Sequence, residues 1–258
     1  MPEIHPTACV EDGAVLADDV VVGAFSFVGR EVELASGVEV APHVTLLGRT
    51  IVGEDCRIFS HACLGGEPQD KGFSGESTSL EIGARTLIRE HVTIHVGTSR
   101  GGGCTRLGED NFLMNSAHIG HDSQIGDHTI IASFCGIGGH TQIGDHAVLG
   151  AFTGLHQYAR VGESVMVAGG SKLSLDAAPY TMVAGDRARL VGLNAVGLKR
   201  RGFSTKTRSE IKRAFHLIFQ SKLRLEEALG RVEDEVGGIP EVERLVSFLR
   251  KTERGFCR

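Results

Sequence analysis

The chain has 258 residues, enough for one large domain or two small ones, and its 35 glycines are accompanied by no tryptophan and only 5% aromatic residues. This composition excludes a core built on bulky aromatic side chains and favours an aliphatic, repetitive one. The formal net charge of −5 is unevenly divided: residues 191–258 carry 15 Lys and Arg against 9 Asp and Glu, and residues 1–190 carry 12 against 23. The basic C-terminal part is either a solvated pair of amphipathic helices or a surface for an acidic partner.

The cysteines and the N-terminus bear on the cellular compartment. The six cysteines form no CxxC pair and no regular disulfide framework, and the first residues lack the basic start and apolar stretch of a signal peptide. Both features indicate a reducing cytoplasm. No stretch approaches the roughly 18 consecutive apolar residues that a membrane span needs, so we expect no integral membrane segment.

A six-residue repeat dominates the first two thirds of the chain. From Ile4 to Leu64 every sixth residue is Ile, Leu or Val, and the same step runs over residues 82–94 and 107–173. Four residues later lies a position that is nearly always Ala, Val, Ser, Thr or Cys, which predicts that Cys56 and Cys135 are packing residues. Short strands wound as a solenoid explain this pattern, because each coil then buries its apolar face on the next, whereas an α-helix has the wrong period.

The pattern resembles that of the hexapeptide-repeat acyltransferases. The resemblance implies a mainly β fold, a left-handed parallel β-helix with 18 residues in each triangular coil. We therefore expect this β-helix over residues 1–190, with loop insertions near 65–81 and 99–106 where the repeat is interrupted.

A different pattern follows once the repeat ends. Residues 191–258 are expected to form a C-terminal α-helical domain. Ser204 is a plausible N-cap for one helix, and Pro240 opens the last one, which carries Val242, Leu245, Val246 and Leu249 on one face.

Histidines gather at one side of the expected coil. Three successive hexads, stacked 18 residues apart, carry His121, His140 and His156. Because adjacent coils are spaced about 4.8 Å apart, these residues should lie within about 10 Å along one edge. When the hexads are counted across the two loop insertions, His95 falls on the same side of the coil. Asp70 falls in the loop that leaves the coil from that side. We expect one constellation with a cleft wall beside it.

Three interpretations of these histidines stand next to one another. Imidazole titrates near neutral pH and suits proton transfer, and both loop insertions converge on this edge. Three imidazoles could instead bind zinc and leave a fourth position open. Surface decoration is the third interpretation, and we assign it to His128 and His146, which also stack but have no neighbouring loop.

A closer resemblance rests on longer motifs. The segments TIHVGTSRGGGCT, NSAHIGHD, GIGGHTQIGD, LHQYARVG, GLKRRGFS and TERGFCR are similar to those of the UDP-N-acetylglucosamine acyltransferase family, which begins lipid A synthesis. The resemblance implies a homotrimer that moves a (R)-3-hydroxyacyl chain from acyl carrier protein to the 3-hydroxyl of a UDP-sugar. It implies no cofactor, no metal and no nucleic-acid partner. The acidic carrier protein agrees with the basic tail.

The same resemblance assigns roles to individual residues. His121 is the general base, Asp122 orients or charges its imidazole, and the backbone N–H of Gly139 binds the oxyanion. Gly169 falls where the family sets acyl-chain length, and a glycine there leaves the groove open for a long chain. The positions that match substrate-binding residues of the family are Asp70, His95, His118, His140, His156, Gln157, Asn194, Arg200 and Arg201.

Two segments depart from the family pattern, and other functions stay open. Val196 replaces a usual acidic residue, and the loop over residues 70–77 differs from the family's sequence near the sugar nucleotide. The nearest alternative is N-acylation of the 3-amino analogue of the UDP-sugar by the same residues. A zinc-dependent hydratase of the carbonic anhydrase type and a non-catalytic solenoid that binds a sugar nucleotide are the others.

Overall fold

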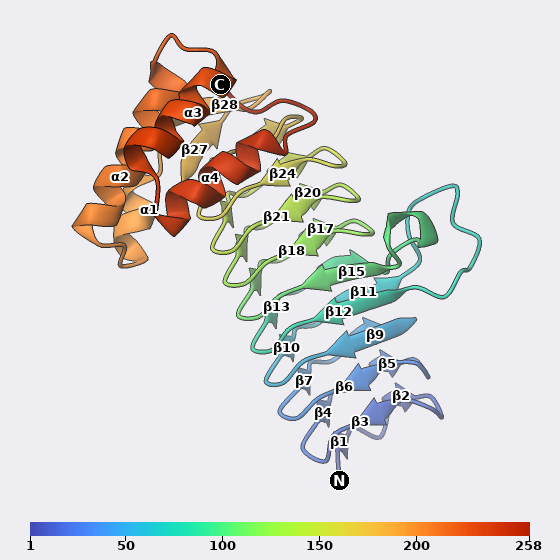
Figure 1. The fold of residues 1–258 in the computed structure, drawn as a ribbon. Helices are drawn as coiled ribbons and strands as arrows, with labels where there is room; N and C mark the ends of the chain where they lie inside the picture. The colour runs from blue at the N-terminus through green and yellow to red at the C-terminus, as the bar shows by residue number, and fades with distance from the viewer.

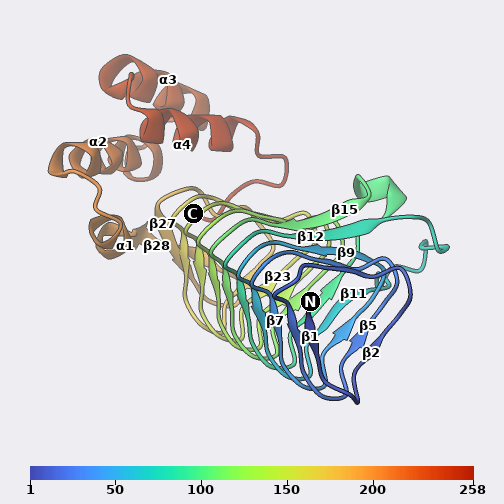
Figure 2. The ribbon, with the colours of Figure 1, turned by 90° about the horizontal axis from the view of Figure 1, so that it is seen from below.

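The computed structural model describes residues 1–258 as a parallel β-helix that is followed by a helical unit (Figure 1). Most strands contain only two residues, and they join in three sheets, which we call A, B and C. Seen along its axis, the β-helix has a triangular cross-section with one sheet on each side (Figure 2). All strand pairs are parallel except that of the last two strands of sheet A, β27 and β28.

Successive coils add one strand at a time to each sheet. Sheet A contains β1 Glu3–Ile4, β4 Val21–Val22, β7 Glu39–Val40, β10 Arg57–Ile58, β13 Leu87–Ile88, β16 Phe112–Leu113, β19 Ile130–Ile131, β22 Val148–Leu149, β25 Met166–Val167, β27 Thr181–Ala184 and β28 Arg189–Leu193. Sheet B contains β2 Cys9–Val10, β5 Phe27–Val28, β8 Thr45–Leu46, β11 Cys63–Gly66, β14 Thr93–His95, β17 His118–Ile119, β20 Gly136–Ile137, β23 Gly154–Leu155 and β26 Lys172–Leu173. Sheet C contains β3 Val15–Leu16, β6 Glu33–Leu34, β9 Arg49–Val52, β12 Ser79–Ile82, β15 Cys104–Leu107, β18 Gln124–Ile125, β21 Gln142–Ile143 and β24 Arg160–Val161.

The six-residue repeat is the core of the β-helix. Its aliphatic side chains are buried from Val22 to Leu173, and each pairs in register with the equivalent residue of the next coil. The second, small position is also buried: Cys56 is 0% and Cys135 is 1% exposed, so both are packing residues as predicted. Only the first coil is open, since Ile4 at the N-terminal end is 41% exposed.

The sheets meet at three corners, AB, BC and CA, named for the sheets that they join in chain order. Two excursions leave the coil at the BC corner and lie beside each other (Figures 1 and 2). The first spans residues 67–78, between β11 and β12. The second spans residues 96–103, between β14 and β15, and contains the 3-10 turn η1, Ser99–Gly101. The expected insertion over 99–106 was therefore too long, because residues 104–106 pair with β12 as part of β15.

The helical unit contains α1 Ala195–Arg200, α2 Thr205–Phe215, the π-helical turn η2 His216–Gln220, α3 Leu225–Val236 and α4 Pro240–Arg250. The Ser204 hydroxyl accepts a hydrogen bond from the Thr207 N–H at 3.0 Å, which confirms the predicted N-cap. Pro240 is the first residue of α4, as expected, and the predicted apolar face of α4 is buried. Helices α1 and α3 were not anticipated as separate elements.

The C-terminal tail returns from the helices to the β-helix. Cys257 lies in the core of the last coil, and its N–H donates to the Asp176 carbonyl at 2.8 Å. The tail therefore ties the helical unit to the end of the solenoid. None of the helices combines the length and apolar character that crossing a membrane requires.

We expect Leu245→Ala in α4 to lower the free energy of unfolding by about 2–5 kcal/mol, because it leaves a cavity among the helices. Leu245 is 1% exposed in the core of the helical unit. Chemical denaturation at fixed protein concentration measures the change. Glu243→Ala on the exposed face of α4 is the matched control, with an expected change within about 0.5 kcal/mol. Equal effects of the two substitutions would contradict the assignment of this face to the core.

Candidate active site

The three stacked hexads place their histidines at the BC corner but in different columns. Ile119, Ile137 and Leu155 pair in register along sheet B. Counting from them, Gly139 and then Gln157 continue the column that starts at His121. A second column holds Asp122, His140 and Tyr158, and His156 belongs to a third. The sequence therefore predicted the edge on which these histidines gather, but not their separation into columns.

His121 and Asp122 form a buried pair. The His121 Nδ1 lies 2.7 Å from Asp122 Oδ2, and the two side chains are 6% and 0% exposed. A carboxylate only accepts hydrogen bonds, so Nδ1 carries the proton and donates it to Asp122. The other ring nitrogen, Nε2, is left as an acceptor, which is the arrangement that a general base requires.

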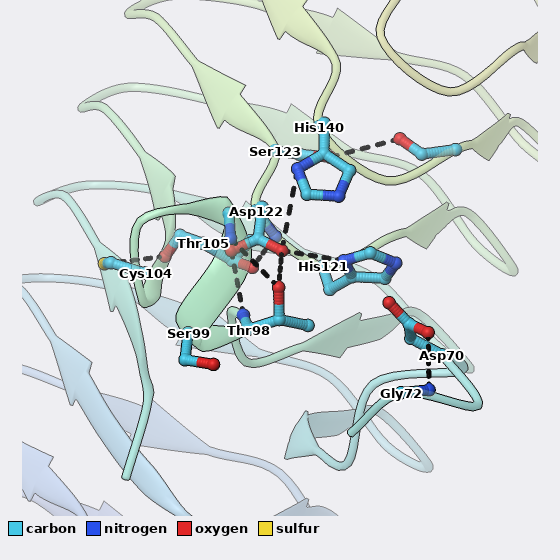
Figure 3. A network of polar contacts seen from close by, with 12 residues as sticks. Asp70, Gly72, Thr98, Ser99, Cys104, Thr105, His121, Asp122, Ser123 and His140 are labelled. Atoms are coloured by element: carbon cyan, nitrogen blue, oxygen red, sulfur yellow. Dashed lines mark hydrogen bonds and ion pairs between the residues drawn. The ribbon is translucent and has the colours of Figure 1, made fainter. Parts of the chain in front are cut away.

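The second excursion holds the Asp122 carboxylate (Figure 3). The Thr98 N–H donates to Oδ1 at 2.8 Å, and the Thr98 hydroxyl donates to Oδ2 at 2.7 Å. The Asp122 N–H donates to the Thr105 hydroxyl at 2.8 Å. Sequence reasoning missed both threonines, although both lie in the TIHVGTSRGGGCT segment.

Gly139 lies against the imidazole of His121. A Cβ atom at this position would come within 2.6 Å of His121 Nε2, so only glycine permits the close approach. The Gly139 N–H makes no hydrogen bond within the chain. A free acceptor nitrogen and a free N–H donor therefore lie on neighbouring coils of one corner.

A pocket of about 290 Å³ opens beside this pair on the sheet B side. Its lining residues are Gln69, His95, His118, Gly120, His121, Gly136, Ile137, Gly138, Gly139, Leu155 and Gln157. Burial, with a smaller contribution from His118 and His121, lowers the pKa of His95 to about 4. Burial also lowers the pKa of His118, whose Nδ1 lies 2.8 Å from the Thr93 hydroxyl. His95 and His118 therefore present uncharged imidazoles to the pocket at neutral pH.

Two of the predicted histidines lie outside this pocket. His140 stacks on Tyr158 with ring centroids 4.4 Å apart and lines a separate pocket of about 620 Å³. Burial lowers the pKa of His140. His156 Nδ1 lies 3.1 Å from Nη2 of Arg254, which the C-terminal tail brings to the corner. Arg254 was missed because nothing in the repeat indicates where the tail returns.

Asp70 belongs to the first excursion and is labelled next to His121 in Figure 3. Its Oδ1 accepts a hydrogen bond from the Gly72 N–H at 2.8 Å, which fixes the turn. The neighbouring Gln69, which sequence reasoning did not select, lines the 290 Å³ pocket. The first excursion therefore supplies one wall of that pocket.

The C-terminal candidates lie on a different corner. The Asn194 side chain caps α1 by accepting from the Gly197 N–H at 3.0 Å, and it donates to the Ser164 carbonyl at 2.9 Å. Arg201 pairs with Glu163 at 2.6 Å. Both contacts anchor α1 to the CA corner, whereas Arg200 is exposed without an ion-pair partner. The single chain therefore does not bring these residues to His121.

Gly169 lies on the third corner, AB, and is exposed. A Cβ atom there would lie 3.1 Å from the Ala151 carbonyl oxygen. Between this corner and the pocket, sheet B presents Gly136 and Gly154, and a Cβ added at either would meet no atom closer than 3.9 Å. The face of sheet B is therefore flat and open from His121 towards Gly169.

The ligand atoms of His121, Asp122 and His140 lie within 4.8 Å of one another, close enough for a metal ion. The Asp122 oxygens already accept three hydrogen bonds, two from Thr98 and one from His121. A metal ion would have to displace these donors from a fully buried carboxylate. The donor set therefore fits a hydrogen-bonded base better than a zinc site.

Comparison with known proteins gives two family matches. Residues 104–139 match the family "Bacterial transferase hexapeptide (six repeats)", and residues 176–257 match "Udp N-acetylglucosamine O-acyltransferase; Domain 2". Among curated proteins, the acyl-[acyl-carrier-protein]–UDP-N-acetylglucosamine O-acyltransferase of Thermodesulfovibrio yellowstonii is 41% identical over all of both chains. The protein of the same name from Syntrophobacter fumaroxidans is 44% identical over 99% of this chain and 100% of its own.

Solved structures agree with these matches. LpxA from Acinetobacter baumannii is similar with a TM-score of 0.96 and 37% identity, over 99% of both chains. The UDP-N-acetylglucosamine acyltransferase from Campylobacter jejuni has a TM-score of 0.94 and 35% identity, also over 99% of both chains. The predicted fold, a left-handed parallel β-helix followed by helices, is confirmed.

The low pKa of His95 leads to a prediction about acid stability. The unfolded chain takes up a proton near pH 6.5, whereas the folded chain holds His95 neutral down to about pH 4. This residue therefore lowers stability progressively as the pH falls through that window. We expect His95→Gln to lose less stability than the unsubstituted chain between pH 7 and pH 5. Urea denaturation at both pH values measures the difference, and an equal or larger loss in the variant would contradict the assignment.

Proposed function

The chain belongs to the UDP-N-acetylglucosamine O-acyltransferase family, and we propose that it transfers a (R)-3-hydroxyacyl chain from acyl carrier protein to the 3-hydroxyl of UDP-N-acetylglucosamine. This step begins lipid A biosynthesis, and we assign it to the cytoplasm. The observation that carries the proposal is the buried pair of His121 and Asp122. The Nε2 of His121 lies beside Gly139, and the Gly139 N–H makes no hydrogen bond within the chain. A base and an oxyanion donor are the two groups that acyl transfer to a hydroxyl needs.

The reaction starts with proton transfer to His121. Nε2 takes the proton of the sugar 3-hydroxyl as the oxygen attacks the thioester carbonyl. The positive charge that develops on the imidazole lies 2.7 Å from the Asp122 carboxylate, which stabilises it. When the carbon–sulfur bond breaks, the same proton passes from Nε2 to the leaving sulfur. No cofactor is needed, because atoms and charge balance within these two steps.

The tetrahedral intermediate places a negative charge on the former carbonyl oxygen. The Gly139 N–H lies next to His121 and has no hydrogen-bond acceptor within the chain, so it can bind this oxygen. Donors of this kind stabilise charge that appears only during the reaction, so they lower the barrier without tightening substrate binding.

Polar groups around the 290 Å³ pocket suit a sugar nucleotide. His95 Nδ1 is buried without a hydrogen-bond partner in the chain, so a ligand can supply one. Neutral imidazoles offer both a donor and an acceptor to sugar hydroxyls. The residues that we assign to binding of the substrates are Asp70, His95, His118, His140, His156 and Gln157, with Asn194, Arg200 and Arg201 from the helical side.

A second copy of the chain explains the position of the last three. The CA corner, which carries Asn194, Arg200 and Arg201, and the BC corner, which carries His121, are separate edges of one rigid prism. Both can reach the same ligand only when the CA corner of one copy faces the BC corner of another. Repeating this contact around a threefold axis closes a homotrimer with three equivalent sites.

The basic surface of the helical unit supports binding of acyl carrier protein, an acidic partner. Lys199, Arg200, Lys206 and Lys212 are exposed on α1 and α2 and have no ion-pair partner in the chain. Charge complementarity of this kind speeds association and orients the carrier before transfer.

The identity of the acceptor atom rests on fewer observations. Val196, which replaces an acidic residue of the family pattern, is 64% exposed on α1, and the 70–77 loop also departs from that pattern. For this reason the 3-amino analogue of the UDP-sugar is the second candidate acceptor. His121 would serve either atom as base, so the acceptor must be tested directly.

We expect His121→Ala to lower kcat by about 10²- to 10⁴-fold, because it removes the general base. Steady-state assays with (R)-3-hydroxyacyl carrier protein and each of the two acceptors measure the loss and identify the preferred acceptor. His43→Ala removes an exposed imidazole of the AB corner, outside the proposed contact between copies, and is the matched control, with activity unchanged. Turnover close to that of the unsubstituted chain in His121→Ala would refute the proposed mechanism.

We expect Gly169→Met to shift the preferred donor to shorter acyl chains. We place the distal end of a long acyl chain beside Gly169, which is exposed at the AB corner, and a methionine side chain would occupy part of that space. Competition between carrier proteins loaded with different acyl chains measures the preference. Gly230→Met in α3, at a site with no atom within 4 Å of a new Cβ, is the control. An unchanged preference in Gly169→Met would remove Gly169 from the acyl groove.

A further inference from the structure

The second excursion brings backbone unusually close to a buried carboxylate. A Cβ atom at Gly101 would lie 2.1 Å from the carboxyl carbon of Asp122, and one at Gly97 would lie 2.9 Å from its Oδ1. Two glycines therefore allow the turn η1 to lie directly against the Asp122 side chain (Figure 3). The second excursion therefore covers this one carboxylate.

Thr98 is the residue of the excursion that binds the carboxylate at both oxygens. Its N–H donates to Oδ1 at 2.8 Å and its hydroxyl donates to Oδ2 at 2.7 Å. The hydroxyl oxygen also accepts a hydrogen bond from the Gly101 N–H at 3.2 Å, so its own hydrogen is directed at Asp122. Thr98 is 3% exposed, which excludes water as a competing donor.

These two hydrogen bonds from Thr98 determine which histidine the Asp122 carboxylate binds. Oδ2 lies 2.7 Å from His121 Nδ1 and 3.7 Å from His140 Nδ1. A rotation about the Cβ–Cγ bond of Asp122 would move this oxygen away from His121 and change its distance to His140. The hydrogen bonds of Thr98 oppose that rotation and keep the short contact with His121.

We propose that Thr98 is a positioning residue for the acyl transfer. Its hydroxyl fixes the Asp122 carboxylate, and through it the ring orientation and tautomer of His121. This inference rests on the proposed function, because it concerns the rate of the step in which His121 is the base. It assigns to the second excursion a part in the reaction.

The test replaces Thr98 with an isosteric residue and with a conservative one. Thr98→Val keeps the backbone N–H and the side-chain shape but removes the hydroxyl, and we expect kcat to fall about 10- to 100-fold because a misplaced catalytic group costs this much. The KM for the UDP-sugar should change less than about threefold, since Thr98 does not line the pocket. Thr98→Ser restores the donor and should recover most of the lost kcat.

Thr129 offers a closely matched control. Its N–H and hydroxyl donate to Asn111 Oδ1 at 2.8 and 2.6 Å, so it repeats the contact of Thr98 at the CA corner, where both residues are buried inside the coil. Thr129→Val removes a buried hydroxyl of the same kind and should leave kcat unchanged. An equal loss of kcat in both valine variants would mean that Thr98 acts only through stability, and would overturn the proposal.

A double-mutant cycle tests whether Thr98 acts through Asp122. In an Asp122→Ala background, Thr98→Val should cause no further loss of kcat. A full additional loss there, or an unchanged kcat in Thr98→Val alone, would overturn the proposal. Gly101→Ala is a second route to the same test if Thr98→Val is recovered poorly, because its methyl group displaces the carboxylate and should also lower kcat about 10- to 100-fold.

The same set of variants separates this inference from the proposed function. If His121→Ala loses turnover while Thr98→Val keeps an unchanged kcat, only the positioning role fails. If His121→Ala retains turnover, the general-base mechanism fails whatever the result at Thr98. Loss in both, with rescue by Thr98→Ser and no effect of Thr129→Val, supports the two together.

Discussion

The parallel register between successive coils is the constraint on which the rest of the structure depends. Strands of two residues pair with their equivalents one coil away, and each carries one aliphatic side chain into the core. A slip of one residue would turn that side chain outwards, so any insertion must leave at a corner and return in phase. Both excursions do so. Strand β9 precedes the first excursion, β12 lies between the two, and β15 follows the second, and β12 pairs with both neighbours without a shift in register.

The same register explains how a charged group comes to be buried beside the pocket. Asp122 belongs to a corner column that ends in His140 and Tyr158, and only at Asp122 does an excursion cover the column. Burying a carboxylate is costly unless hydrogen bonds replace its water, and in this corner Thr98 and His121 supply them. Without the excursion the carboxylate would be solvated, and its contact with His121 would compete with water.

The sequence was informative wherever the period held. It predicted the aliphatic core, the packing of Cys56 and Cys135, and the edge that carries the histidines. It could not identify Thr98, because an excursion has no period, and hydrogen bonds from backbone and hydroxyl groups leave no pattern in residue types. Arg254 could not be identified for a related reason. It contacts His156 from 98 positions away along the chain, and only the folded chain shows the path of the C-terminal tail.

The two ends of the solenoid differ in a way that bears on where a site can form. At the N-terminal end the core residue Ile4 is 41% exposed, Val10 and Leu16 are half-buried, and no element covers the first coil. At the other end the hairpin β27–β28 and the tail close the last coil, since Cys257 enters the core and bonds to Asp176. In a solenoid each coil is stabilised only by its neighbours, so an uncovered end frays most easily. His121 lies in an interior coil and His156 in a covered one, so the columns of the BC corner stay rigid. Rigidity is needed because the base His121 must stay within hydrogen-bond distance of Asp122.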